Sequence, residues 1–371
     1  MTRILVAGLK EPPGGVENAV LAYTDNFNDS EVVVDFAFVC GKVPYEDRIK
    51  NGKAIYLPNR IRHPLLYRKK LKSIFSSENY DVLWCNYSGL TNIDFLKTAK
   101  KFGVKKRIVH AHTSRHSWGN QLMKYLVPFF HSKNQRVVDR YVTDYWACSK
   151  KSAEFMFGKK LAQKAVIIPN TVDTDKFYRD LKTRLEVLQE FSIPQEAIVI
   201  GHVGRMCAEK NQCFLLDIVK EAIKLNEKAI LLFVGDGELR DSVISYAKEI
   251  GIEKKVVFTL SRKDIPRLFC AMDVFLLPSL TEGFPVTVVE AQAADVPCVV
   301  SEEAVIKQAD LTGDMCFVSL EESAEHWAKA LLDAAKKALT GGRVLVKAKG
   351  YDCKTESKKI QEFFEGDEKK V

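Results

Sequence analysis

The sequence lacks the patterns that mark several large classes of protein. No apolar run approaches the roughly 18 residues needed to cross a bilayer, and we find neither a low-complexity tract nor an internal repeat. The chain passes from Met1 directly into the apolar stretch 4–9 without the pattern of a cleavable signal. These absences lead us to expect a globular protein of the cytoplasm, in keeping with 46% hydrophobic and 28% charged residues.

Two further motifs are missing, and each absence argues against a kind of chemistry. The nine cysteines form no C-x-x-C pair, and several lie within apolar runs such as ADVPCVV, so we expect reduced, buried thiols. No G-x-G-x-x-G opens either set of strands, because the glycines of GLKEPPGG are wrongly spaced, which argues against a dinucleotide-binding oxidoreductase. No recognised nucleic-acid-binding module is found, and we expect no nucleic-acid partner.

The net charge of +8 is unevenly distributed along the chain. Residues 1–180 hold 30 Lys and Arg against 17 Asp and Glu, which gives +13. Residues 181–371 hold 26 against 31, which gives −5. The basic half suggests contact with something anionic, although composition alone equally fits an ordinary solvated surface.

Short apolar segments alternate with helical patterns, which is typical of parallel α/β architecture. The pattern predicts a first series of strands at 3–8, 32–39, 54–58, 80–85, 107–112, 144–148 and 165–169. A second series begins afresh and covers 197–204, 229–235, 256–260, 273–278 and 297–301. The expected helices are 16–27, 64–77, 91–103, 149–158, 211–226, 238–251, 264–272, 285–294, 321–340 and 352–366.

This restart indicates two domains, each a doubly wound parallel sheet. At 371 residues the chain exceeds the size at which single cores stop growing, and the polar stretch 172–195 between the two series contains no predicted strand. We expect Rossmann-like domains at 1–180 and 181–345, followed by a C-terminal helix and a solvated tail at 346–371. Open sheets of this kind bind ligands beyond the carboxyl ends of their strands, so we look for function there.

Two cations follow the first strand of the second series. Arg205 comes directly after Gly204, and Lys210 lies six residues beyond that glycine, before a predicted helix. Two positive charges beside a helix N-terminus suit a diphosphate, although a pair of surface cations at a loop would look the same. The next strand ends in the turn Gly235-Asp236-Gly237, which either approaches a ligand closely or is an ordinary turn.

The segment SLTEGFPVTVVEAQAA carries two glutamates eight residues apart. Pro285 suits the first turn of a helix, whose free N–H groups would lie near 283–287. Glu282 precedes this turn and Glu290 lies inside the apolar helix, so both could face one ligand. The alternatives are an acid placed at a helix N-terminus and a half-buried carboxylate with a structural partner.

Together these segments resemble the donor-binding half of the retaining GT-B glycosyltransferases, specifically glycosyltransferase family 4. GRMCAEKNQ, FVGDGELR and PSLTEGFPVTVVEAQAA follow the family's order, and Glu282 and Glu290 match its E-x7-E motif. In the N-terminal half, EPPGGVENAV resembles the family's glycine loop and RIVHAHTSR its histidine segment, while YDCKTESKKIQEFF resembles a terminal helix that returns to the N-terminal domain. The most similar subgroup is that of bacterial capsular or exopolysaccharide assembly.

The resemblance implies a GT-B fold, with two Rossmann-like domains facing an interdomain cleft, an N-terminal acceptor domain and a C-terminal donor domain. The implied reaction moves a sugar with retention from a nucleotide diphosphate sugar, such as a UDP-sugar, to a saccharide or lipid-linked acceptor. The implied catalytic residues are Arg205, Lys210, Glu282 and His112. The implied donor-binding residues are Gly14, Gly15, Gly204, Gly235, Gly283, Phe284, Pro285, Val286, Thr287 and Glu290.

Within this resemblance each side chain has an implied role. Arg205, Lys210 and the helix N-terminus would stabilise the departing diphosphate, so no metal or other cofactor would be required. Glu282 would hold sugar hydroxyls and Glu290 ribose hydroxyls, while His112 would orient a sugar hydroxyl or the acceptor. Asp173 and Asp175 form a D-x-D, but they lie in the polar junction, and we expect no metal there.

Three points stay open at this stage. Ala294-Asp295 stands where the family commonly has a glycine, which predicts a differently made turn. The stretch SRHSWGNQLMKYLVPFFHSKNQR and the basic RHPLLYRKKLK favour peripheral contact with an anionic membrane, although the aromatic side chains could equally pack inside the domain. The rival functions are a non-catalytic nucleotide-sugar binding module and a related two-domain enzyme, such as a nucleotide-sugar epimerase or a phosphorylase.

Overall fold

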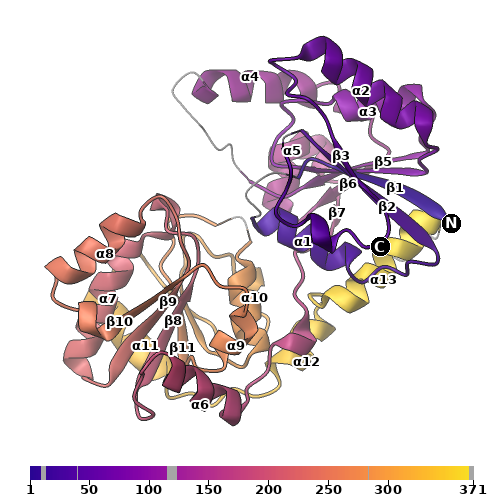
Figure 1. Cartoon of the computed structure of the whole chain (residues 1–371). Helices are drawn as coiled ribbons and strands as arrows, with labels where there is room; N and C mark the ends of the chain where they lie inside the picture. The colour runs from indigo at the N-terminus through magenta and orange to yellow at the C-terminus, as the bar shows by residue number, and fades with distance from the viewer. Residues whose placement is uncertain (10–13, 40, 115–122, 283, 367–371) are drawn as a thin grey trace. The chain divides into compact units, whose positions relative to one another are not determined.

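The computed structural model divides the chain into two compact units (Figure 1). It describes residues 1–9, 14–39, 41–114, 123–282 and 284–366. The N-terminal unit consists of Met1–Thr171 and Cys353–Val371, and the C-terminal unit of Val172–Asp352. The last helix of the chain therefore belongs to the N-terminal unit.

The N-terminal unit is built on one parallel sheet of seven strands in the order β3-β2-β1-β4-β5-β6-β7. The strands are β1 (Thr2–Ala7), β2 (Val32–Phe38), β3 (Ala54–Tyr56), β4 (Val82–Tyr87), β5 (Lys106–Ala111), β6 (Asp144–Ala147) and β7 (Val166–Ile167). The helices are α1 (Gly15–Thr24), α2 (Pro64–Ser77), α3 (Asp94–Lys101), α4 (Met123–Gln135), α5 (Lys150–Ala162) and α13 (Cys353–Glu365). The central strands read as apolar runs because both faces of the sheet are covered.

Two hydrophobic layers enclose this sheet. On one face α2, α3 and α5 pack against alternate strand residues such as Leu83 and Val109. On the other face α1 and α13 pack against the alternate set, which includes Trp84 and Trp146. The ring of Phe364 on α13 lies 5.5 Å from that of Trp84, so the terminal helix completes this aromatic layer.

The C-terminal unit repeats the design with a parallel sheet of six strands in the order β10-β9-β8-β11-β12-β13. The strands are β8 (Ile198–Val203), β9 (Ala229–Val234), β10 (Val256–Leu260), β11 (Val274–Leu277), β12 (Cys298–Ser301) and β13 (Cys316–Val318). The helices are α6 (Leu181–Glu190), α7 (Gln212–Leu225), α8 (Arg240–Glu249), α9 (Ile265–Phe269), α10 (Val286–Ala293), α11 (Ala324–Ala334) and α12 (Gly342–Ala348). Helices α7, α8 and α11 cover one face, and α6, α9, α10 and α12 cover the other.

Both strand orders place the reversal of winding between the first strand and the fourth. The reversal lies between β1 and β4 in the N-terminal unit and between β8 and β11 in the C-terminal unit. Helices leave toward opposite faces at this point, so the strand ends there open a crevice, which is the usual ligand site of such sheets.

Gly158 ends a helical segment, as expected: its φ of +75° is not helical, and a second segment, counted within α5, continues from there to Ala162. The stretch 172–195 contains no strand, as expected, but it does contain helix α6, capped by the Asp180 carboxylate, which accepts a hydrogen bond from the Thr183 N–H at 2.7 Å. Cys213 is exposed rather than buried; the eight described cysteines are free thiols, and Cys40 lies outside the described residues.

The amphipathic stretch 114–136 contains helix α4 in its described part. Its expected members Arg115, Trp118 and Leu122 lie outside the described residues. In the described part of the chain, no helix is long and apolar enough to span a bilayer.

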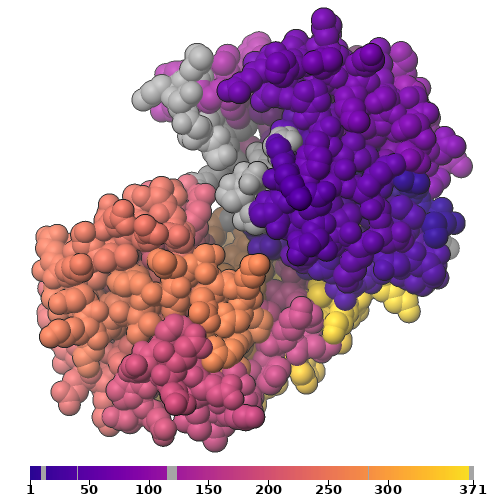
Figure 2. Space-filling model, in the orientation of Figure 1, coloured from indigo at the N-terminus to yellow at the C-terminus, as the bar shows by residue number. Residues whose placement is uncertain are grey.

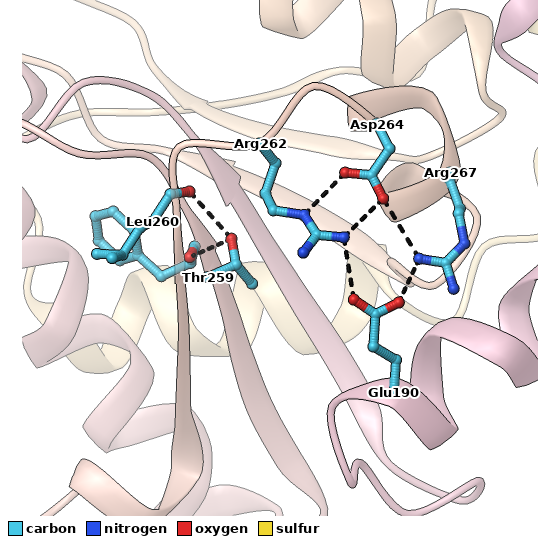
Figure 3. Close-up of polar contacts among 7 residues, drawn as sticks. Glu190, Thr259, Leu260, Arg262, Asp264 and Arg267 are labelled. Carbon is cyan, nitrogen blue, oxygen red and sulfur yellow. Dashed lines mark hydrogen bonds and ion pairs between the residues drawn. The ribbon is translucent and has the colours of Figure 1, made fainter.

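Charged side chains join helix α9, which follows β10, to helix α6 (Figure 3). Arg262 donates hydrogen bonds to Asp264 at 2.8 Å and to Glu190 at 3.0 Å, and Arg267 donates to Glu190 at 2.5 Å. Because Glu190 ends α6 and Arg267 lies on α9, this network joins the two helices beside the end of β10.

The backbone at the end of β9 comes very close to the end of β8 at Gly235. A Cβ at this position would lie 1.9 Å from the Gly204 carbonyl oxygen, and its φ is +146°. Gly251 also has a positive φ, +78°, but a Cβ there would meet nothing within 4 Å. We expect Gly251→Ala to cost about 1 kcal/mol of unfolding free energy, from backbone strain alone.

Gly235→Ala should cost more than about 3 kcal/mol, because the strain is joined by a clash between two backbones. Urea denaturation of the two variants measures the difference. Equal losses would contradict the close approach of the two strand ends.

Candidate active site

Two glycines form the floor of the crevice in the C-terminal unit. The Gly204 N–H donates to the Val234 carbonyl at 3.0 Å, and the Gly235 N–H donates to the Leu260 carbonyl at 2.9 Å. Leu260 has a φ of +58° and stands beside a register shift in β10, where its carbonyl accepts the Gly235 N–H. No side chain projects from either glycine, which leaves the backbone open to a close ligand.

The central feature of the crevice is an ion pair between the loops that follow β8 and β11. The Lys210 ammonium donates to the Glu282 carboxylate with an Nζ–Oε1 distance of 2.7 Å, and their side chains are only 18% and 10% exposed. A Cβ at Gly204 would lie 3.5 Å from the Lys210 Cε, which places this ammonium group over the glycine floor. The structure thus brings together three of the candidate residues at the reversal point of the sheet.

Side chains that sequence reasoning missed hold this pair in place. The Ser279 hydroxyl donates to the same Glu282 oxygen at 2.6 Å, and the Ser301 hydroxyl donates to the Ser279 carbonyl at 2.6 Å. Asn211, in the left-handed conformation, donates from its amide to the Pro278 carbonyl at 3.2 Å and so ties the Lys210 loop to the Glu282 loop. Ser279 comes directly after the predicted strand 273–278, which was the available signal for it, whereas Ser301 and Asn211 lie inside predicted elements.

His202 is a second residue that sequence reasoning missed. Its Nδ1–H donates to the Leu276 carbonyl at 3.0 Å, which leaves the buried Nε2 with no hydrogen bond to a described residue. A Cβ at Gly204 would lie 3.2 Å from this nitrogen. Burial and the nearby Lys210 charge lower the pKa of His202 to about 4, so the ring is neutral at physiological pH.

Helix α10 begins directly after the Glu282 loop. Pro285 is its N-cap, one residue earlier than expected for the first turn, and no side chain caps the helix. Within its first turn, the buried Thr287 hydroxyl has no hydrogen bond to a described residue. Phe284 stacks on Tyr351 with ring centroids 5.3 Å apart, which anchors the approach to the helix; Gly283 lies outside the described residues.

The structure at the end of α10 shows how the turn at Ala294-Asp295 forms without the glycine that is common there in the family. Asp295 adopts the left-handed conformation, with a φ of +56°, that a glycine would adopt more cheaply. Its carboxylate accepts a hydrogen bond from the Gly342 N–H at 2.7 Å. The turn therefore keeps the glycine-like geometry and uses the side chain to dock α12.

Glu290 lies on α10, four residues beyond Val286, and is half-buried. Burial raises the pKa of its carboxyl to about 7, because the charged form loses hydration without gaining an opposite charge. A group that donates hydrogen bonds to the carboxylate would favour the ionised form. Such a carboxyl is suited to binding ligand hydroxyls.

Arg205 stands apart from the ion pair. Its guanidinium is 4.0 Å from the Glu238 carboxylate, and its side chain is 66% exposed. The Cys207 sulfur as hydrogen-bond partner and, to a smaller extent, nearby carboxylates raise its pKa. The charge is available to a ligand at the rim, whereas Lys210 is held inside.

In the N-terminal unit, His112 lies directly beyond the end of β5. Its Nε2 is 2.9 Å from the Asn86 Oδ1, so the ring donates there and presents Nδ1 as an acceptor with no described partner. Burial lowers the pKa of His112 to about 4, more than the polar neighbour Asn170 raises it. His110 lies under it, with ring centroids 4.1 Å apart, and is neutral for the same reason.

Gly14 and Gly15 begin helix α1. The Gly14 N–H donates to the Glu17 carboxylate at 2.9 Å, and a Cβ at Gly15 would meet nothing within 4 Å. Asp173, of the D-x-D, is paired with Lys176 at 3.1 Å. Among the residues that the structure describes, no group of three or more His, Cys, Asp or Glu side chains is arranged to hold a metal ion.

Comparison with known proteins places this geometry in a family. The model described as Glycosyltransferase Family 4 matches residues 13–176, and the model described as Glycosyl transferases group 1 matches residues 197–337. The chain is 27% identical over 336 residues to the putative glycosyltransferase EpsF of Bacillus subtilis, covering 87% of this chain and 85% of that protein. It is 28% identical over 308 residues to an Escherichia coli UDP-Gal:alpha-D-GlcNAc-diphosphoundecaprenol alpha-1,3-galactosyltransferase, covering 77% and 74%.

Solved structures of other glycosyltransferases share this fold. Anabaena Alr3699/HepE in complex with UDP and glucose superposes with a TM-score of 0.77 at 18% identity, over 98% of this chain and all of that one. The lipopolysaccharide outer core galactosyltransferase WaaB superposes with a TM-score of 0.68 at 17% identity, over 98% of this chain. The fold is therefore that of the GT-B enzymes. Since the two family models match both halves of the chain in order, the chain belongs to glycosyltransferase family 4, and it is a glycosyltransferase of the hexosyltransferase type.

The buried pair can be tested by removing one partner. Lys210→Ala leaves the Glu282 carboxylate buried without its counterion, and we expect a loss of roughly 3 kcal/mol of unfolding free energy. The double variant Lys210→Met/Glu282→Gln should lose less than the sum of the losses in Lys210→Met and Glu282→Gln measured separately.

The matched control is Lys224→Ala, which breaks an exposed pair to Glu221 with the same 2.7 Å separation and should cost less than about 1 kcal/mol. Urea denaturation measures all five variants. Additive losses in the double variant would show that the two side chains do not interact.

The raised pKa of Glu290 predicts a dependence of stability on pH. The folded-state pKa of about 7 lies above the ordinary 4.5, so this contribution to stability is complete below pH 4.5 and is lost as the pH rises through 7. Glu290→Gln should therefore gain up to about 3 kcal/mol relative to wild type between pH 5 and pH 8.

Urea denaturation of both proteins at the two pH values gives this difference, and contributions of other groups cancel. Glu249→Gln, at an exposed glutamate on α8, serves as the control and should show no such gain. A difference in unfolding free energy between Glu290→Gln and wild type that stays constant with pH would contradict the raised pKa of Glu290.

Proposed function

We propose that the enzyme transfers a sugar with retention from a UDP-sugar to a saccharide or lipid-linked saccharide in the assembly of a surface polysaccharide. The observation that carries this proposal is the buried Lys210–Glu282 pair at the reversal point of the C-terminal sheet. UDP and glucose in the HepE structure, and the UDP-Gal donor and diphosphoundecaprenol acceptor named for the Escherichia coli relative, support the substrate classes.

The C-terminal unit would hold the diphosphate by charge and by backbone N–H groups. Lys210 is buried over the glycine floor, Arg205 is free to turn inward from the rim, and the uncapped start of α10 offers its first N–H groups. An anion placed there gains from the helix dipole and from a cation already stripped of most of its water. These groups replace the charge that a divalent metal would supply, so we propose a metal-independent reaction.

Binding would also change the partner of Lys210. In the ligand-free protein this ammonium neutralises Glu282, and a diphosphate would compete for it. The carboxylate would then be available to accept hydrogen bonds from sugar hydroxyls while Ser279 still holds one of its oxygens. Loading of the phosphates and of the sugar would in this way be coupled through one ion pair.

Glu290 would take the ribose. Ribose hydroxyls that donate to its carboxylate favour the ionised form and offset the unfavourable burial of the charge. Gly204 and Gly235 leave room for the nucleotide against the backbone, and residues 284–287 form the turn beneath the phosphates. In the N-terminal unit we propose that Gly14 and Gly15 approach the substrates and that the free Nδ1 of His112 accepts a hydrogen bond from a sugar or acceptor hydroxyl.

The chemical step breaks the bond between the anomeric carbon and the diphosphate oxygen. The electron pair leaves with the diphosphate, where Lys210, Arg205 and the α10 N-terminus stabilise the developing charge. The acceptor hydroxyl forms the new bond on the same face of the sugar and passes its proton to the departing phosphate oxygen. No covalent intermediate with the enzyme forms, and the configuration of the anomeric carbon is kept.

This proposal predicts transfer that persists in EDTA and fails when the anion site is removed. Lys210→Ala should lower kcat by at least about 100-fold, because a donor aimed at the developing charge is lost. Glu282→Ala should lower it by a similar factor, because the carboxylate that would hold the sugar hydroxyls in place is lost. Radiolabelled UDP-sugar measures turnover at a temperature where both variants remain folded, and ¹H NMR of the anomeric proton reports the configuration of the product.

Lys224→Ala, far along α7 from the crevice, should keep wild-type activity. Full turnover in both site variants would reject the assignment of the residues. Loss of activity in EDTA would reject metal independence, and an inverted product would reject retention.

A further inference from the structure

Two helices of the N-terminal unit carry apolar side chains on their exposed faces. Beside and within α2, Ile61 is 86% exposed and Leu65 is 78% exposed; on α4, Tyr125 is 72% and Phe129 is 61% exposed. Leu66, Met123, Leu126 and Phe130 add to them. Helices normally bury such residues, so a contiguous exposed set indicates an interaction site. We call residues 60–72 and 123–135 the α2–α4 surface.

The two segments meet around one cavity of about 910 Å³. Arg60, Ile61 and Arg68 line it from the α2 side, and Met123, Leu126 and Phe130 from the α4 side. Its remaining wall includes Gly8 and Tyr87, at the ends of β1 and β4, where the winding of the N-terminal sheet reverses. Ile61, Met123, Leu126 and Phe130 of the exposed apolar set therefore line the crevice of this unit, and the two segments that carry the set meet there.

The charge of this surface has a single sign. Residues 60–72 contain six cations and no acid, namely Arg60, Arg62, Arg68, Lys69, Lys70 and Lys72. Residues 123–135 add Lys124 and Lys133, again without an acid. Arg60 is paired with Asp94 at 2.9 Å, but no carboxylate of the described residues pairs with the other five cations of residues 60–72. The segment that includes α2 lies on the outer surface of the unit in the space-filling view (Figure 2).

We propose that the α2–α4 surface docks on an anionic lipid bilayer. Phenylalanine, tyrosine and leucine side chains enter the boundary between headgroups and acyl chains, and lysine and arginine bind the lipid phosphates beside them. A protein partner fits less well, since lysine is depleted from protein–protein interfaces and five lysines lie on this surface.

Docking in this way presents the crevice of the N-terminal unit to the bilayer. An acceptor held in the membrane by a lipid would reach the ends of β1 and β4 without leaving the lipid phase. The inference thereby deepens the proposed function and rests on it for the identity of the acceptor, although membrane binding itself is measured without any turnover.

Sedimentation of the full chain with phosphatidylcholine vesicles, with and without phosphatidylglycerol, tests the proposal. We expect binding only to the anionic vesicles, with loss of most binding at high salt. Lys69→Glu/Lys70→Glu should lower the partition coefficient on the order of tenfold or more, since each cation near an anionic surface contributes. Lys159→Glu/Lys160→Glu, an equal change of charge at exposed lysines of α5, should lower it less.

The apolar part of the surface has its own variant and control. Leu65→Ser/Phe129→Ser should weaken vesicle binding several-fold even at low salt, while transfer to a soluble acceptor is unchanged. Leu181→Ser/Val344→Ser, at equally exposed apolar residues of the C-terminal unit, should bind as wild type does.

Three outcomes would overturn the proposal. The first is no binding to anionic vesicles at low salt, and the second is equal binding to neutral vesicles. The third is an equal loss of vesicle binding in the variants of the α2–α4 surface and in their controls. A dimer in sedimentation equilibrium that dissociates in Leu65→Ser/Phe129→Ser, without vesicle binding, would assign the surface to a second copy of the chain. Vesicle binding with failed transfer would reject the proposed function and leave this inference standing.

Discussion

The buried ion pair between Lys210 and Glu282 is the contact on which the candidate site depends. Its two members come from loops 72 residues apart in the chain, and they meet because β8 and β11 are neighbours in the sheet. The pair is costly to desolvate, and the structure compensates with a serine hydroxyl on the carboxylate. A pair of this kind is weak evidence for stability and better evidence that the charges are needed where they stand.

The neighbours of the pair show how a backbone can be shaped around it. Gly204 and Gly235 touch through their main chains, and Leu260 accepts a left-handed conformation that presents its carbonyl to Gly235. Strain at Leu260 and the absence of side chains at the two glycines both lower stability. Their joint effect is a stretch of backbone without side chains beside a cation whose side chain is only 18% exposed, and packing of the core does not require it.

Much of the fold could be predicted from the sequence because parallel strands are buried on both faces and read as apolar runs. Glu282, Lys210 and the start of α10 could be located for the same reason, since each follows such a run. Helix α4 could not be assigned from the pattern, because its apolar side chains face outward and give no buried stripe. The break at Gly158 could be predicted, because a glycine that adopts a positive φ commonly ends a helical segment.

What the sequence could not provide is the pairing of side chains across loops. Arg205 and Lys210 are both cations of the same loop in the sequence. In the structure Arg205 is exposed at the rim, whereas Lys210 forms an ion pair with the Glu282 carboxylate. Asp295 replaces an expected glycine, and only its hydrogen bond to Gly342 explains why the left-handed turn is retained. Ser279 and His202 carry no motif of their own, and their importance rests entirely on which atoms they reach.

Glu290 shows why a carboxylate is kept inside an apolar helix at a cost to the fold. Burial raises its pKa to about 7, so the folded protein resists ionising a group that water would ionise freely. A methionine or leucine in its place would pack without that penalty. Burial makes ionisation of Glu290 costly in the empty site. Hydroxyl donors of a bound ligand would stabilise the ionised carboxylate, and the removal of this cost would then add to the binding free energy. A neutral glutamine would stabilise the ligand-free protein and weaken its binding of the ligand. A residue kept for binding lowers stability in this way, whereas a purely structural residue does not.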